Sequence, residues 1–89
     1  MPSISMFYGI IIYMFFSDNV QHHKPHIHAK YAEHTAVFDI DTAEVIEGKF
    51  PPKETRLVQA WILLRQRELA ADWDLASQNE MPFKVKPLD

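Results

Sequence analysis

Four of the chain's five histidines lie within one stretch of seven residues, and they are its most distinctive chemical feature. They are His22, His23, His26 and His28. Histidine can change its charge near neutral pH, and the neutral imidazole is the commonest metal ligand in proteins. Such a cluster suits metal binding, proton transfer in catalysis, or recognition of a partner at a pH-sensitive surface.

The residues around the cluster predict a β-hairpin that carries two of these histidines on one face. Residues 26–31 alternate between polar and apolar side chains, and a second alternating run follows at residues 36–41. Two alternating runs with a short connection are typical of a hairpin. Since alternate side chains of a strand leave the same face, His26 and His28 project together, away from the interleaved apolar side chains.

With Tyr31 opposite Ala36, the apolar side chains of both runs collect on one face, and we expect this pairing for a connection of either two or four residues. A shift by one residue would mix polar and apolar side chains on each face, which a buried core resists. The same register places His28 opposite Asp39 and His26 opposite Asp41. Opposed Cβ atoms in a hairpin lie about 4.5–5.5 Å apart, so each aspartate could accept a hydrogen bond from an imidazole.

The first function open to this arrangement is metal binding. His23, His26 and His28, with Asp39 as a further ligand, could hold a divalent transition metal such as zinc. Three protein ligands and a water molecule are typical of a catalytic zinc site. A metal-bound histidine commonly donates its other N–H to a carboxylate, which the opposed aspartates could accept. The same ligands could also form a metal-binding module without catalysis.

The second function is acid–base catalysis by the histidines themselves. His26 and His28 could transfer protons, and Lys30 on the same face could stabilise a developing negative charge. This set of residues suits a histidine-dependent hydrolase, most plausibly a small ribonuclease that acts with or without a bound metal. The net charge of −3, however, opposes binding to long nucleic acids through their phosphates.

The third function is recognition of another protein by the polar face of the hairpin. A fourth interpretation is structural, because the outer face of a half-buried hairpin needs polar residues. A cross-strand His–Asp pair then contributes only on the order of a few tenths of a kcal/mol. For each histidine alone the structural interpretation is the better one. For the four together a function is favoured, because histidine is scarce and such tight clustering is uncommon.

Other patterns predict the remaining elements. Residues 6–16 are apolar on both alternating faces, which is typical of one central buried strand, with Gly9 at a bulge. A shorter strand follows over residues 44–50. Over residues 53–77 the apolar side chains recur with helical spacing, so one long helix packs on the sheet. Residues 82–87 alternate weakly and could add an edge strand.

The sequence therefore predicts a single α+β domain over residues 1–89, with a small, mainly antiparallel sheet of four or five strands and one long C-terminal helix packed on one face. The predicted helical stripe contains Val58, Trp61, Ile62, Leu69 and Trp73, with Leu57 and Leu64 beside it. The chain has no cysteine, which excludes disulfides and thiolate metal sites. Its longest apolar run is shorter than the roughly 20 residues that span a bilayer, so we expect a cytoplasmic protein without a membrane partner.

Three groups of residues are specific in combination: Phe7-Tyr8-Gly9-Ile10, then His23-x-Pro25-His26-x-His28-Ala29-x-Tyr31, then Lys86-Pro87-Leu88. These motifs resemble an uncharacterised bacterial family, domain of unknown function 4160. Genes of this family often stand beside a gene for another small domain, and such pairs are sometimes given as toxin–antitoxin modules. The resemblance thus implies a second small protein as partner, or self-association, more firmly than it implies a reaction. We therefore expect a partner-binding component of a two-gene module, with the histidine cluster at its working surface.

Overall fold

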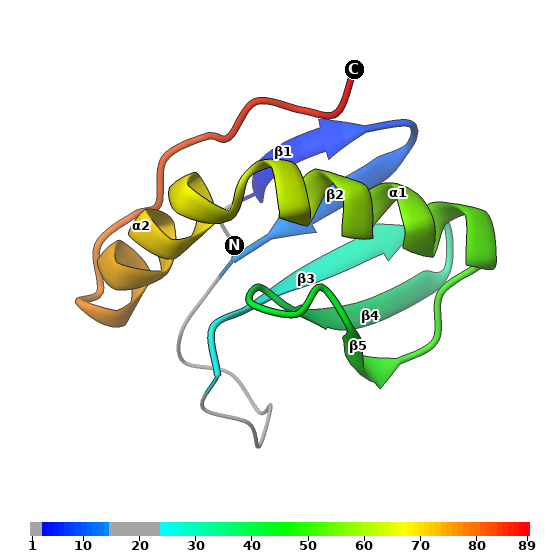
Figure 1. The fold of residues 1–89 in the computed structure, drawn as a ribbon, viewed down its shortest axis with the longest axis horizontal. Helices are drawn as coiled ribbons and strands as arrows, with labels where there is room; N and C mark the ends of the chain where they lie inside the picture. Colours follow the sequence, from blue (N-terminus) through cyan, green and yellow to red (C-terminus); the bar gives the residue numbers. More distant parts are fainter. Residues whose placement is uncertain (1–2, 15–23) are drawn as a thin grey trace.

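The chain folds into a five-stranded sheet and two helices, which confirms the predicted α+β class (Figure 1). The computed structural model describes residues 3–14 and 24–89. In chain order the elements are β1 (Ser3–Phe7), β2 (Ile10–Tyr13), β3 (His26–Tyr31), β4 (His34–Asp39), β5 (Val45–Gly48), α1 (Pro52–Leu64) and α2 (Gln66–Ser77). Within the described residues, no helix is long and apolar enough to cross a membrane.

The sheet is an antiparallel meander in which each strand pairs with the next strand of the chain. Antiparallel neighbours need only short connections, and two of the turns contain just two residues. The predicted strand over residues 44–50 is confirmed in shorter form as β5. The order β1-β2-β3-β4-β5 makes β1 and β5 the two edge strands.

The apolar run that predicted one strand over residues 6–16 is instead a hairpin. Tyr8 and Gly9 form the turn between β1 and β2, with φ angles of 50° and 78°. Positive φ at both central residues is typical of a type I′ turn, whose twist suits a two-residue hairpin. The single strand and its bulge at Gly9 were therefore wrong predictions. The end of the run, residues 15 and 16, lies outside the described residues.

The hairpin predicted around the histidines is present, but its register differs by two residues. Ala32 and Glu33 alone form the connection, and Tyr31 lies opposite His34. The expectation that a two-residue connection would keep Tyr31 opposite Ala36 was therefore wrong. Ala32 adopts a φ of 53°, a conformation that turn rules assign to glycine or asparagine. Because the shift is even, the side chains keep their predicted faces while their cross-strand partners change.

The one long helix predicted over residues 53–77 is two helices that meet at Arg65. The backbone of Arg65 departs from helical geometry, with φ −121° and ψ 22°. The side-chain amide of Gln66 donates to the carbonyls of Ile40 and Asp41, in the turn that follows β4. This long-range contact ties the first residue of α2 to the sheet, at a break that contains neither proline nor glycine.

Both helices cover the same face of the sheet, and the core lies between the two layers (Figure 1). Trp61 is fully buried, and its ring lies 5.3 Å from the ring of Phe7, centroid to centroid. The predicted stripe is confirmed at Val58, Trp61, Ile62, Leu69 and Trp73, whereas Leu64 is 64% exposed. The facing sheet positions include Ile4, Ile10, Ile12, Ile27, Ala29, Ala36 and Phe38.

The C-terminal tail, residues 80–89, forms no strand, so the edge strand predicted over residues 82–87 is wrong. The tail nevertheless packs beside β1. The N–H of Val85 donates to the carbonyl of Ile4 at 2.7 Å, and the indole of Trp61 donates to the carbonyl of Lys86 at 2.8 Å. Val85 is buried, so the tail completes the core between the helices and β1.

Candidate functional site

The sheet face opposite the helices carries a row of aligned side chains from four strands. The register places Tyr13 beside His28, His28 beside Val37, and Val37 beside Glu47. A parallel row contains Met6, Ile11, Lys30 and Thr35. We call these eight residues the outer face. The outer face thus mixes apolar side chains with a tyrosine, a histidine, a lysine and a glutamate.

His28 occupies the middle of the outer face, as the alternation of the sequence predicted. It is half-buried, and it lines a hollow of about 230 Å³ together with Thr35, Val37 and Glu47. Lys30, two residues further along β3, is exposed on the same face. The structure therefore brings His28 and Lys30 to one accessible surface, which is the part of the predicted catalytic set that solvent reaches.

His26 departs from the expected solvated position. Its side chain is only 2% exposed, and its ring centroid lies 4.8 Å from that of Trp73 in α2. The ring of His28 also lies beside it, 5.3 Å away, centroid to centroid. The helix α2 extends beside the end of the sheet at which β3 begins, so the first side chain of β3 is covered (Figure 1). The prediction that both imidazoles face solvent is therefore correct for His28 and wrong for His26.

A backbone contact defines the protonation of His26. Its Nδ1 lies 2.7 Å from the carbonyl oxygen of Lys24. A carbonyl oxygen can only accept a hydrogen bond, so Nδ1 carries a proton, and in the neutral ring Nε2 is the acceptor. An imidazole that donates one N–H to a backbone carbonyl has the orientation and tautomer common among metal-bound and catalytic histidines.

The predicted partners of the two histidines are corrected by the register. His26, not His28, lies opposite Asp39, and His28 lies opposite Val37. Asp41 lies beyond β4 in an exposed turn. The reason is the two-residue connection of the hairpin, which moves each partner by two positions.

Asp39 is buried at the end of β4, and its carboxylate has a clear structural role. One oxygen accepts the backbone N–H groups of Asp41 and Thr42, at 2.7 and 3.0 Å. The N–H of Ile40 donates to the carbonyl of Pro25, so the adjacent pair formed by His26 and Asp39 is of the non-hydrogen-bonded type, in which side chains lie closest. Asp39 therefore holds the turn together beside His26.

The predicted metal ligands are brought together only in part. His26, His28 and Asp39 lie at the same end of the β3–β4 hairpin, while His23 lies outside the described residues, as does His22. In residues 3–14 and 24–89, no three histidine, aspartate or glutamate side chains are grouped so that they could hold a metal ion. The metal site therefore stays a prediction that depends on His23.

Sequence reasoning missed three neighbours of the histidines. Tyr13 was assigned to a strand buried on both sides, Glu47 was placed on no face, and Trp73 was expected only in the helical core. The alternation of Ile10, Ile11, Ile12 and Tyr13 shows no contrast of polarity, so it gave no signal for a face. The contact of Trp73 with His26 joins elements far apart in the chain.

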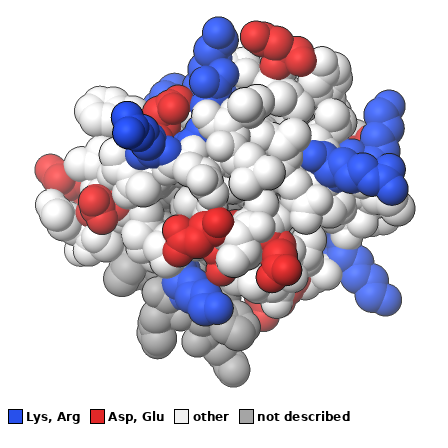
Figure 2. Space-filling view, viewed as in Figure 1, with Lys and Arg blue, Asp and Glu red and all other residues white. Residues whose placement is uncertain are grey.

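Charges on the visible surface are mixed. Figure 2 shows lysine and arginine side chains interspersed with acidic ones on the face in view, without one continuous basic patch. Proteins that track nucleic-acid phosphates usually concentrate lysine and arginine on one surface. The charge distribution on this face thus agrees with the low expectation for RNA drawn from the net charge.

Comparison with known proteins identifies a family but no characterised relative. No curated protein and no solved structure matches the chain. A family model matches residues 9–74, which is more than half of the chain and includes all of β2, β3, β4, β5 and α1. The chain therefore belongs to the family described as "Domain of unknown function (DUF4160)".

Proposed function

We propose that this chain is the partner-binding component of a small, cytoplasmic two-gene module of toxin–antitoxin type, and that the outer face meets the partner. The single observation that carries the proposal is an exposed apolar side chain on a sheet face that neither α1 nor α2 covers (Figure 1). Met6 is 65% exposed, and it lies beside Ile11 on the outer face. Monomeric proteins rarely expose large contiguous apolar patches unless a partner covers them.

The composition of the outer face suits a protein partner. Interface cores are enriched in aromatic residues and methionine, and they are surrounded by polar groups that can form hydrogen bonds. Tyr13 and Met6 provide the aromatic and methionine side chains of such a core. The polar groups are an imidazole, an ammonium and a carboxylate, from His28, Lys30 and Glu47. The complementary partner is a small protein that offers an apolar centre and hydrogen-bonding groups around it.

Co-expression with the product of the neighbouring gene tests this proposal. Size-exclusion chromatography with light scattering should give a stable complex. Met6→Asp should weaken that complex at least about tenfold, because a charge at an interface centre leaves a desolvated group without a partner. Leu64→Asp is the matched control, since Leu64 is equally exposed but lies on α1.

His28→Ala provides a second variant at the outer face. It should also weaken the complex, because it removes an imidazole from the middle of the aligned row without disturbing the core. The proposal fails if no neighbouring gene product associates with the chain. It also fails if the complex tolerates both outer-face variants as well as it tolerates Leu64→Asp.

A histidine-dependent hydrolase is the second candidate, supported by the tautomer of His26 and by Lys30 on the same face as His28. A proton-bearing Nδ1 leaves Nε2 as the basic or metal-ligating atom of a neutral His26. Growth arrest on expression, relieved by both His26→Ala and His28→Ala, would support this function. RNA left intact by the purified protein, with and without added zinc, would exclude a ribonuclease.

A further inference from the structure

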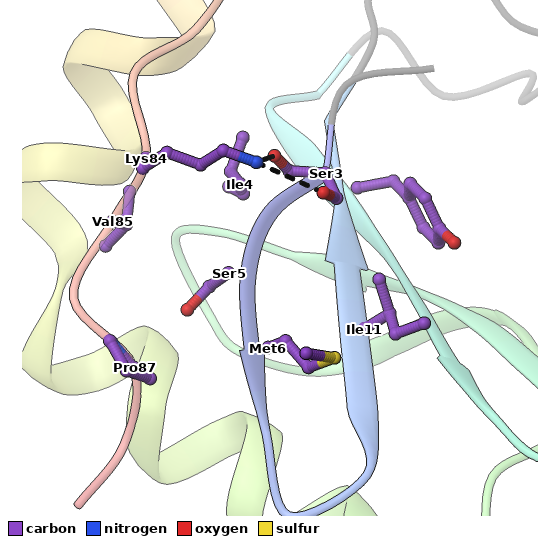
Figure 3. Close-up of a pocket in the computed structure, with 9 residues that line it drawn as sticks. Ser3, Ile4, Ser5, Met6, Ile11, Lys84, Val85 and Pro87 are labelled. Carbon is purple, nitrogen blue, oxygen red and sulfur yellow. Dashed lines mark hydrogen bonds between the residues drawn. The ribbon is translucent and has the colours of Figure 1, made fainter.

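No further inference is drawn: the strongest candidate, the groove of about 400 Å³ between the edge strand β1 and the C-terminal tail (Figure 3), carries nothing, because the buried hydroxyl of Ser5 lies out of a ligand's reach, the tail already bonds β1 at Ser3 and Ile4, and nothing in the described part of the chain shows what would occupy the space.

Discussion

Gly48 marks the closest approach of β5 to β4. Its φ is +84°, in the left-handed region, and an added Cβ would lie 2.5 Å from the carbonyl oxygen of Thr35 and 3.0 Å from the Cα of Ala36. Backbone atoms paired in a sheet cannot move aside easily. We expect Gly48→Ala to lower the free energy of unfolding by ~3 kcal/mol, the sum of left-handed strain and overpacking.

Gly9→Ala is the natural control for this prediction, because Gly9 has a similar φ of +78°. Its added Cβ would meet only the ring edge of Tyr31, 3.3 Å away, and that side chain can shift. The expected loss is about 1–2 kcal/mol, from the backbone alone. Urea denaturation of both variants measures the difference. Equal losses would mean that the contact with Thr35 is not the cause.

Asp72 is a buried carboxyl with an incomplete set of partners. One oxygen accepts the N–H of Phe83 at 3.0 Å, and the other has no partner among the described residues. Burial raises the pKa of Asp72 above its usual value, and the charge of Glu68 adds to this, while the N–H of Phe83 acts in the opposite direction. A raised pKa means that folding favours the neutral acid, so ionisation of Asp72 makes the folded state less stable.

Asp72→Asn should therefore stabilise the protein at pH 7, because it keeps an acceptor for Phe83 without the buried charge. Because folding and proton binding are linked, the parent loses stability as pH rises from the pKa of an aspartate in the unfolded chain, about 3.9, through the raised pKa of Asp72 in the folded state. The variant has no carboxyl at this position and does not lose this stability. The gain over the parent should thus be larger at pH 7 than at pH 4 in urea unfolding. Asp74→Asn, at an exposed position of α2, should show no such difference between the two pH values.

At the scale of the elements, the turn of the β3–β4 hairpin decides the partners of the histidines. Ala32 holds a φ of 53°, which costs about 1–2 kcal/mol for a residue with a Cβ. Ala32 is exposed, so the change to glycine loses no packing. We expect Ala32→Gly to raise the thermal midpoint, with a net gain of ~0.5 kcal/mol after the extra entropy of glycine in the unfolded chain.

Thr35→Gly is the contrasting variant, because Thr35, the second residue of β4, is exposed and has no positive φ. Glycine there should lower stability by about 0.5–1 kcal/mol. If Ala32→Gly destabilises the protein as much as Thr35→Gly does, the left-handed conformation of Ala32 is not what strains this turn.

The same turn explains how far the sequence could predict the site. Alternation assigned His28 and Lys30 correctly to one face, because the apolar Ile27, Ala29 and Tyr31 must face the core. The register could not be read, since Ala32-Glu33 contains none of the glycine or asparagine signals of a two-residue turn. The two candidates of the same parity were Asp39 and Asp41 for His26, and Val37 and Asp39 for His28, and only the turn length distinguishes them.

The prediction of the helices and of the first hairpin was limited in a similar way, because the sequence pattern gave no signal at the positions where these elements end. Helical periodicity continues through Arg65, so the apolar stripe from Val58 to Trp73 was predicted correctly, although no residue in the sequence indicated the break between the helices. The break depends on Gln66 reaching the turn after β4, a contact between distant parts of the chain. The burial of His26 against Trp73 has the same origin. Local patterns encode faces, whereas contacts between elements decide which polar residues on a face stay exposed.

At the scale of the whole molecule, both ends of the chain lie outside the region that defines the family. The family match covers residues 9–74, yet β1 and the tail pack against each other and enclose one side of the core. Ile4 from the first end and Val85 from the last end are both buried and share a backbone hydrogen bond. The two ends therefore stabilise the domain together.

Val85→Asp tests this closure of the fold. Val85 is 6% exposed, so the change removes a buried side chain and introduces a charge beside Ile4, and we expect a loss of ~3 kcal/mol or more. Phe83→Asp is the control on the same tail, because Phe83 is 73% exposed and should change stability by less than about 0.5 kcal/mol. Urea unfolding gives both values, and hydrogen exchange at β1 should accelerate only in Val85→Asp. If that variant unfolds at the parent's urea midpoint, the tail lies on the domain without stabilising it.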